Sequence, residues 1–172
     1  HFLSDRLQLG AFQRSTLTAC TASTQAIALA YDSVAWGEAS LVITGGTDSI
    51  LNLISFMAFS KLGVISPSNE TPDRICKPFD KGRVSTLVGE SAGICVLVNE
   101  EFLKKSGLSP KIEFLGYGNT LDGYKITSPD PSGKGMKRAM EQALSNSGVK
   151  PQDVDYINLH GTGTLANDPI EA

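Results

Sequence analysis

Blocks of two kinds alternate along the chain. Short runs that are almost wholly apolar predict buried strands, because a strand covered on both faces needs no polar side. Between these runs, apolar residues recur every three or four positions, which predicts helices with one buried face. We expect strands at 40–46, 92–100, 110–120 and 153–164, and helices at 23–38, 50–60, 100–107 and 130–148.

This alternation predicts an α/β fold in which helices cover both faces of a sheet. The strand at 40–46 closes with two glycines, so we expect the chain to turn there. Prolines punctuate residues 62–86, which predicts a long surface excursion. Thr21 or Ser23 is the expected cap of the helix at 23–38.

Composition limits the classes of function. The 172 residues suit one domain or part of a larger one, and 41% hydrophobic residues suffice for a core. A net charge of −3 gives no basic face for nucleic acid, and no apolar run approaches the roughly 20 residues that span a bilayer. Three irregularly spaced cysteines fit neither a disulfide framework nor a zinc site, which favours a reducing cytoplasm.

Cys20 is the strongest candidate nucleophile. It lies between an extended segment and the helix at 23–38, where backbone N–H groups and the helix dipole favour a thiolate and could hold an oxyanion. The alternative is an inert packing residue, which the local context alone favours, since most free cysteines pack. Cys95 lies inside an apolar strand and is expected in the core, and Cys76 has no helix start beside it.

His160 is the only histidine in the sequence besides His1. It stands at the expected carboxyl end of an apolar strand, where open α/β sheets bind ligands, and it directly precedes "GTGT". An imidazole there can hydrogen-bond a reacting carbonyl, or it can be a satisfied structural residue. Thr162 and Thr164 can bond the backbone locally or contact a polar ligand.

Two acidic residues, Asp168 and Glu171, stand three positions apart at the start of a further expected helix. Asn167 or Asp168 is its expected cap. The local role that we expect for both carboxylates is capping and complementation of the helix dipole. The alternative is a buried carboxylate pair that orients a nearby cation.

The segment "KPFDKGR" holds further candidates, for which structural roles are the local expectation. Phe79 could wall an apolar tunnel, and Asp80 could pair with Arg83. Glu90, which precedes an apolar strand, would need a partner if it were buried.

Six motifs, in this order and at the expected separations, resemble those of β-ketoacyl-acyl carrier protein synthases, the elongating condensing enzymes of fatty acid and polyketide synthesis. Each motif is weak alone, but the ordered set is specific and covers nearly the whole chain from about Leu7 onward. The motifs are "TLTACTAST", "ITGGTDS", "KPFDKGR", "GESAG", "DGYKITSP" and "YINLHGTGTLANDPIEA".

The resemblance implies a thiolase-like fold, in which two related halves build alternating layers of helices and mixed sheets. Residues 1–110 would form the later part of the first half, and residues 111–172 the beginning of the second. By the same resemblance, Cys20 accepts the acyl group and His160 is the first of two catalytic histidines. It further implies substrate-binding residues at Thr162, Thr164, Thr127, Ser128 and Phe79, and a supporting acidic network of Asp168, Glu171 and Glu90.

The implied reaction is acyl transfer to Cys20, followed by decarboxylative Claisen condensation with a malonyl thioester. Both groups would arrive on the phosphopantetheine of acyl carrier protein, and the implied chemistry needs no metal or redox cofactor of the enzyme's own. A cytoplasmic homodimer without a membrane span is expected. The family's catalytic lysine, second histidine and Gly-rich loop are expected beyond Ala172, so we expect a fragment that cannot complete condensation alone.

Three alternatives stay open. A non-catalytic chain-length partner of an active synthase would lack the nucleophilic cysteine, so Cys20 argues against it. A Cys-His hydrolase of another fold would turn over esters or peptides without forming a carbon–carbon bond. In a binding or structural module, Cys20 and His160 would only pack.

Overall fold

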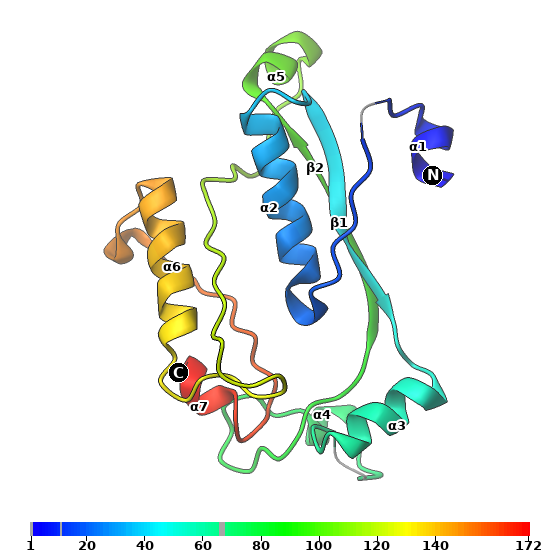
Figure 1. Ribbon diagram of the computed structural model, residues 1–172, viewed down its shortest axis with the longest axis vertical. Helices are drawn as coiled ribbons and strands as arrows, with labels where there is room; N and C mark the ends of the chain where they lie inside the picture. The colour runs from blue at the N-terminus through cyan, green and yellow to red at the C-terminus, as the bar shows by residue number, and fades with distance from the viewer. Residues whose placement is uncertain (1, 11, 66–67) are drawn as a thin grey trace. The chain divides into compact units, whose positions relative to one another are not determined.

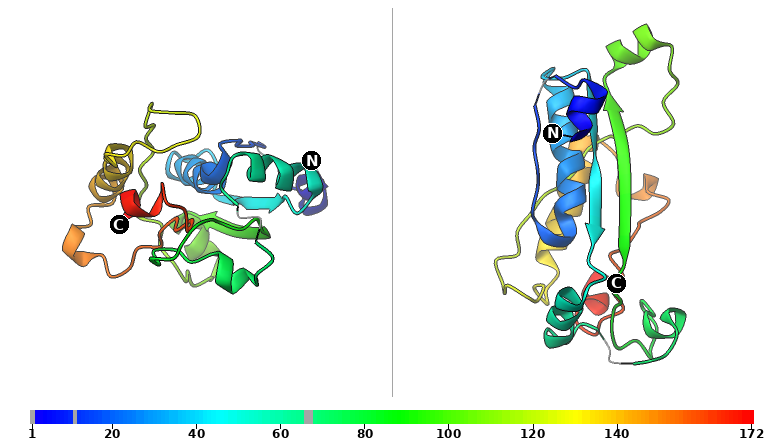
Figure 2. Two further views of the ribbon diagram at one scale, coloured as in Figure 1. Left: turned by 90° about the horizontal axis from the view of Figure 1, so that it is seen from below. Right: turned by 90° about the vertical axis from the view of Figure 1, so that its right-hand side faces the viewer.

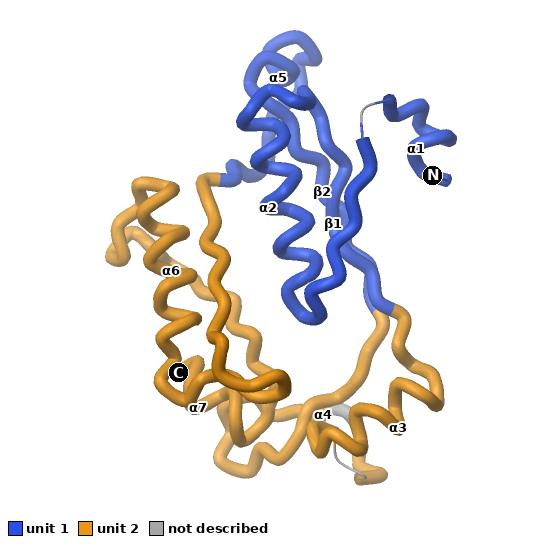
Figure 3. Tube along the Cα trace, viewed as in Figure 1, with its two compact units in different colours: residues 1–48, 91–114 blue, residues 49–90, 115–172 orange. Residues whose placement is uncertain are grey.

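The computed structural model describes residues 2–10, 12–65 and 68–172. The chain forms two compact units, each assembled from two separate stretches of sequence (Figure 3). Unit 1 consists of His1–Asp48 and Ser91–Phe114, and unit 2 of Ser49–Glu90 and Leu115–Ala172. The division expected at residue 110 stays a prediction. Within the described ranges, no helix combines the length and apolar character needed to cross a bilayer.

Two antiparallel strands, β1 (Leu41–Ser49) and β2 (Glu90–Val98), form the sheet of unit 1 (Figures 1 and 2). Both were expected from their apolar runs. Next to their ends, the Asn99 N–H donates to the Ser40 carbonyl at 3.1 Å. Cys95 of β2, expected in the core, is exposed. That expectation was wrong because β2 is exposed from Glu90 to Val96.

The two glycines expected to end β1 lie inside the strand instead. They allow close packing: a Cβ on Gly45 would collide with the Gly93 carbonyl of β2, and a Cβ on Gly46 would collide with Ser23. Gly45 also has a φ of 150°, a backbone conformation that side chains disfavour. Without side chains at these positions, β2 and the start of the helix that precedes β1 in the sequence can both approach β1.

The described residues of unit 1 form three α-helices: α1 (Phe2–Leu7), α2 (Ala22–Ala35) and α5 (Glu100–Ser106). The helices expected at 23–38 and 100–107 are thereby confirmed. Thr21 precedes α2, but its side chain makes no capping hydrogen bond. Its hydroxyl donates instead to the Thr18 carbonyl at 2.8 Å. At the start of α5, the Asn99 side chain accepts the Phe102 N–H at 2.8 Å.

Unit 2 contains four α-helices among its described residues. The expected helices at 50–60 and 130–148 are confirmed, and Asn52 caps the first by accepting the Ser55 N–H at 3.0 Å. The helix expected at Asp168 is present, but neither a capping Asn167 side chain nor a capping Asp168 side chain is found. The four are α3 (Leu53–Lys61), α4 (Pro72–Ile75), α6 (Lys134–Ser147) and α7 (Asp168–Glu171).

The strands expected at 110–120 and 153–164 are not present as strands. A strand needs a neighbour for its backbone groups, and side chains of α6 take that place along the first segment. The Asn146 amide donates to the Tyr117 carbonyl at 2.9 Å, and the Gln142 side chain accepts the Asn119 N–H at 3.0 Å. Along the second segment, residues 154–160 are exposed.

Among the described residues of the surface excursion expected at 62–86, the chain forms the short helix α4 and folds back on itself. Isolated parallel bridges join Ile65 to Thr86 and Cys76 to Ser85. Ile65 and Ser85 are buried, with exposed fractions of 6% and 2%. The excursion therefore has a small core of its own, which fixes the position of "KPFDKGR" within unit 2.

Gly45→Ala should lower the free energy of unfolding by at least about 2 kcal/mol, because the new methyl group would meet a backbone carbonyl that cannot rotate away. Urea denaturation of the full-length protein measures the loss. Gly93→Ala is the matched control, since a Cβ there meets no atom within 4 Å. Equal stability of the two variants would contradict the close approach.

Candidate active site

Cys20 lies in a 3₁₀ turn, Ala19–Thr21, that runs directly into α2. Its side chain is exposed. Ala19 has a φ of 52°, a left-handed conformation that costs a non-glycine residue free energy and turns the chain sharply before the cysteine. The Thr16 hydroxyl donates to the Ala22 carbonyl at 2.8 Å and ties the preceding segment to this turn. Cys20 is thus presented at a helix start, as the sequence indicated.

His160 belongs to unit 2, where the carboxylate of Glu171 fixes its backbone. One oxygen of this carboxylate accepts the His160 N–H, and the other accepts the Gly161 N–H at 2.8 Å. The Asn167 amide donates to the same carboxylate at 3.1 Å. The His160 side chain is exposed, so Glu171 holds the main chain and leaves the imidazole at the surface of unit 2.

Asp168 is the most deeply buried charged residue among those described, with 1% of its surface exposed. Its Oδ2 accepts the Phe79 N–H at 2.8 Å, and its Oδ1 accepts the Gly163 N–H at 3.1 Å. The Arg83 Nε lies 3.6 Å from Oδ2. Asp168 therefore joins the loop around Phe79 to the loop that follows His160.

These contacts correct two expectations. Asp168 and Glu171 do not serve mainly as caps of α7, because their oxygens are occupied by donors from other segments. Arg83 does not pair with the Asp80 side chain, which accepts the Gly82 N–H; Arg83 donates to the Asp80 backbone carbonyl at 3.0 Å and lies against Asp168. The alternative of a buried carboxylate beside a cation is correct for Asp168.

The two threonines of "GTGT" interact with each other and with the next turn. The hydroxyls of Thr162 and Thr164 are 2.9 Å apart, and Thr164 Oγ1 accepts the Asn167 N–H at 3.2 Å. Gly163 between them has a φ of 73°, and a Cβ there would come within 2.9 Å of the Ser85 carbonyl. The local role of the threonines is thereby observed, and their contact with a ligand stays a prediction.

The other predicted site residues are spread over unit 2. Phe79 has a φ of 63°, and its ring lies beside Gly161. Thr127 is exposed and Ser128 half-buried in the loop before α6. Glu90 is exposed at the start of β2 and accepts hydrogen bonds from the Ser49 hydroxyl at 2.8 Å and the Leu51 N–H at 3.2 Å. The roles expected for these four stay predictions.

The site also contains residues that sequence reasoning passed over. Arg83 was considered only as a partner of Asp80, and Asn167 only as a cap. The signal for Arg83 was its place in "KPFDKGR", but nothing in that motif pointed to a carboxylate 85 positions away. Because Arg83 and Asp168 are so far apart in the sequence, their contact could not be predicted from a local motif.

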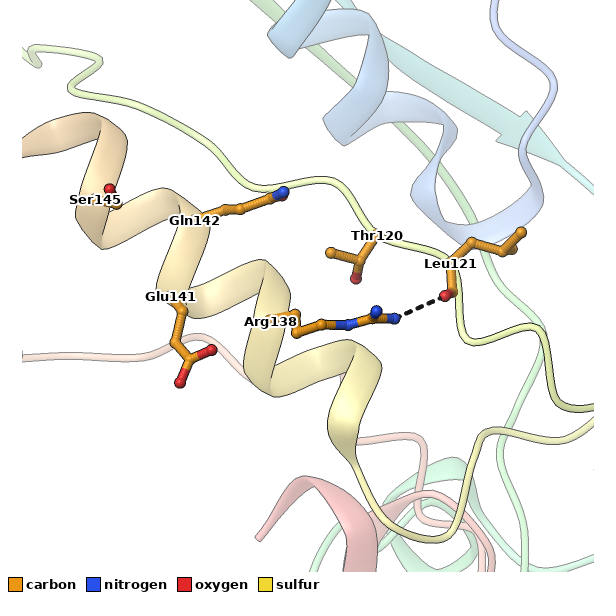
Figure 4. A pocket seen from close by; sticks show the side chains of 6 residues that line it. All are labelled: Thr120, Leu121, Arg138, Glu141, Gln142 and Ser145. Carbon is orange, nitrogen blue, oxygen red and sulfur yellow. Dashed lines mark hydrogen bonds between the residues drawn. The ribbon is translucent and has the colours of Figure 1, made fainter.

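A shallow pocket of about 440 Å³ lies along α6, away from the predicted site residues (Figure 4). Arg138 reaches across it and donates to the Leu121 carbonyl at 3.1 Å. The Thr120 hydroxyl also donates to the Gly135 carbonyl of α6 at 2.7 Å, so the segment at 120–121 is bonded to α6 beside the pocket. The lining does not include the loop of His160. Its lining residues are Thr120, Leu121, Arg138, Glu141, Gln142 and Ser145.

Comparison with protein families identifies the class. The model of the N-terminal domain of β-ketoacyl synthases matches residues 2–102, and that of the C-terminal domain matches residues 112–172. The chain therefore belongs to the β-ketoacyl synthase family, as its motifs predicted.

Individual relatives agree with this assignment. The chain is 39% identical over 154 residues to 3-oxoacyl-[acyl-carrier-protein] synthase 2 of Staphylococcus aureus, and 41% identical over 156 residues to that of Synechocystis sp.. These alignments include 90% and 91% of this chain but 38% of each relative. The chain thus spans about two fifths of the length of these curated relatives.

Solved structures confirm the thiolase-like fold class of the ketosynthases. A type II PKS ketosynthase in complex with its acyl-carrier protein matches with a TM-score of 0.94 and 26% identity, covering 99% of this chain and 42% of that one. The ishigamide ketosynthase/chain length factor matches with a TM-score of 0.88 and 33% identity, covering 99% and 40%.

Electrostatics around Glu171 favour its ionised form. Partial burial raises the pKa of Glu171, but the N–H groups of Gly161 and His160 and the Asn167 amide outweigh it and lower the pKa below the ordinary 4.5. An ionised carboxylate accepts all three donors, whereas a protonated one competes with them. The anchoring of His160 thus depends on the charge of Glu171.

Glu171→Gln should lower the free energy of unfolding by about 1 kcal/mol at neutral pH, because an amide offers one acceptor oxygen to three donors. Since the folded pKa lies below the unfolded one, the wild-type advantage is complete above pH 4.5 and disappears as the pH falls through the folded value. Urea denaturation across this range measures the difference.

The control for this prediction is Glu141→Gln, which removes an exposed carboxylate of α6 that lies 3.7 Å from the Lys137 ammonium. The free energy of unfolding of Glu141→Gln should stay close to that of the wild type over the same pH range. A Glu171→Gln deficit of constant size at every pH would contradict the assigned role of the charge.

Proposed function

We propose that the protein containing this chain is a 3-oxoacyl-acyl carrier protein synthase, which elongates acyl chains in fatty acid or polyketide synthesis. The observation that carries the proposal is Cys20 in an exposed turn at the start of α2, within a match to the β-ketoacyl synthase family. The loop of His160, anchored by two carboxylates, supports it from the second half of the chain.

In the proposed first step, the Cys20 thiolate attacks the carbonyl carbon of an acyl thioester. The tetrahedral intermediate collapses with loss of the carrier's thiolate, which takes up a proton. The acyl group then remains on Cys20 as a new thioester. Backbone N–H groups of the turn and the first residues of α2 are the donors that the developing oxyanion would meet.

In the second step, a malonyl thioester loses carbon dioxide, and the electron pair of the broken bond moves toward the thioester oxygen as an enolate. The His160 imidazole is proposed to donate an N–H to that oxygen. The enolate carbon attacks the acyl carbonyl on Cys20 and expels the Cys20 thiolate. The product is a β-ketoacyl thioester two carbons longer.

The partner proposed for both steps is acyl carrier protein, whose phosphopantetheine carries the acyl and malonyl groups. One matched structure is described as a ketosynthase in complex with its acyl-carrier protein, and others as ketosynthases with a chain length factor. We propose no metal or redox cofactor, because every electron pair in the reaction comes from the thiolate or from decarboxylation. A cytoplasmic homodimer, a second histidine, a lysine and a Gly-rich loop stay predictions from the resemblance.

Acylation of Cys20 is the direct test. The full-length protein incubated with an acyl thioester of acyl carrier protein should gain the mass of one acyl group per chain, located on the peptide that contains Cys20. Cys20→Ser should abolish the gain, and Cys76→Ser, the control, should retain it. Acylation of Cys76 instead, or none in the wild type, would favour a packing role for Cys20.

His160→Ala should slow release of carbon dioxide from malonyl-acyl carrier protein by about 10²-fold, because the enolate oxygen loses a hydrogen-bond donor. Radiolabelled carbon dioxide provides the measurement, and Lys150→Gln, an exposed change in the same unit, is the control. If the wild-type protein hydrolysed esters but released no carbon dioxide from malonyl-acyl carrier protein, the hydrolase alternative would be favoured.

A further inference from the structure

One carboxylate joins two loops that are far apart in the sequence. Asp168 accepts the Phe79 N–H with one oxygen and the Gly163 N–H with the other, at 2.8 and 3.1 Å. Both loops belong to unit 2. Gly163 lies three residues after His160, so the path of the His160 loop depends on where this carboxylate is held.

A carboxylate that is 1% exposed cannot be neutralised by solvent. Backbone N–H groups supply partial positive charge, but a full charge needs a cation or further donors. The Arg83 Nε lies 3.6 Å from Asp168 Oδ2, and the Arg83 side chain is 18% exposed. Arg83 is the cation that the described contacts place at this carboxylate.

Arg83 is itself fixed from the other side. Its Nη1 donates to the Asp80 carbonyl at 3.0 Å, the same carbonyl that accepts the Arg83 N–H at 3.2 Å in the turn from Asp80 to Arg83. The guanidinium therefore bridges the backbone of its own loop and the carboxylate of α7. A lysine ammonium could supply the charge, but as a single point charge it would not keep both contacts in one plane.

We propose that Arg83 is a positioning residue for the reaction, acting through Asp168 on the loop that carries His160. It neutralises the buried carboxylate, and the neutralised carboxylate holds Phe79 and Gly163. Without Arg83, the unpaired charge of Asp168 moves toward solvent and releases both N–H groups. His160 then keeps only its anchor to Glu171, and its imidazole loses its fixed place. This inference rests on the proposed function.

The experiment compares Arg83→Gln and Arg83→Lys with wild type in the full-length protein. Arg83→Gln should lower kcat for release of carbon dioxide from malonyl-acyl carrier protein by about 10²-fold, the effect expected of a displaced catalytic group, with little change in KM. Arg83→Lys should lower this kcat less than Arg83→Gln does, because lysine keeps the positive charge. Lys81→Gln, an exposed change in the same loop, is the control and should match wild type.

Measuring acylation of Cys20 in the same variants distinguishes a displaced His160 loop from a general loss of structure. A displaced His160 loop should affect decarboxylation far more than acylation, whereas partial unfolding should lower both in proportion. Equal losses in the two steps, or wild-type decarboxylation by Arg83→Gln, would overturn the inference. If Arg83→Gln does not fold, Arg83→Lys carries the same comparison of the two steps.

A double-mutant cycle tests the route through Asp168. Combining Arg83→Gln with Asp168→Asn removes cation and anion together, so the combined loss in kcat should be smaller than the product of the two single losses. A simple product would show that Arg83 acts without Asp168. Absence of both acylation and decarboxylation in the wild type would instead refute the proposed function, which keeps the two failures distinct.

Discussion

The buried carboxylate of Asp168 imposes the strictest constraint on unit 2. A charge with 1% exposure has to be met by donors within the protein, and the chain supplies them from two loops and from Arg83. Phe79 adopts a left-handed backbone there, and Gly163 stands where a side chain would meet the Ser85 carbonyl. The left-handed backbone at Phe79 and the crowded position of Gly163 are both compensated, because each conformation directs an N–H at the Asp168 carboxylate.

Glu171 has a different task, although it stands only three residues away. It is half-buried and binds the backbone at His160 and Gly161, and its donors outweigh the desolvation that opposes its charge. The two acidic residues thus bind different parts of the loop that starts at His160. Glu171 binds its first two residues, and Asp168 binds Gly163. In unit 1, by comparison, Cys20 is presented without a carboxylate anchor, through the left-handed turn at Ala19 and the Thr16 hydroxyl that donates to the Ala22 carbonyl.

Much of the fold followed from local patterns. Helices with regular apolar spacing and recognisable ends, such as α2, α5 and α6, appear close to their expected bounds. The expectations that were wrong concern which segments of the chain pack against one another. The glycines of β1 looked like a turn, since a close neighbour cannot be read from a single strand. The segment at 110–120 looked like a strand, but side chains of α6 meet its backbone groups instead.

The sequence alone determined the family, the nucleophile candidate and the histidine, because these are carried by residue type and order within short motifs. It also placed both carboxylates in the right segment. Tertiary structure decided what the carboxylates do: capping and anchoring require the same residues, and only the position of distant N–H groups distinguishes them. For the same reason Arg83 acquired its partner only in the fold, since an ion pair between residues 83 and 168 depends on loop closure that no local pattern encodes.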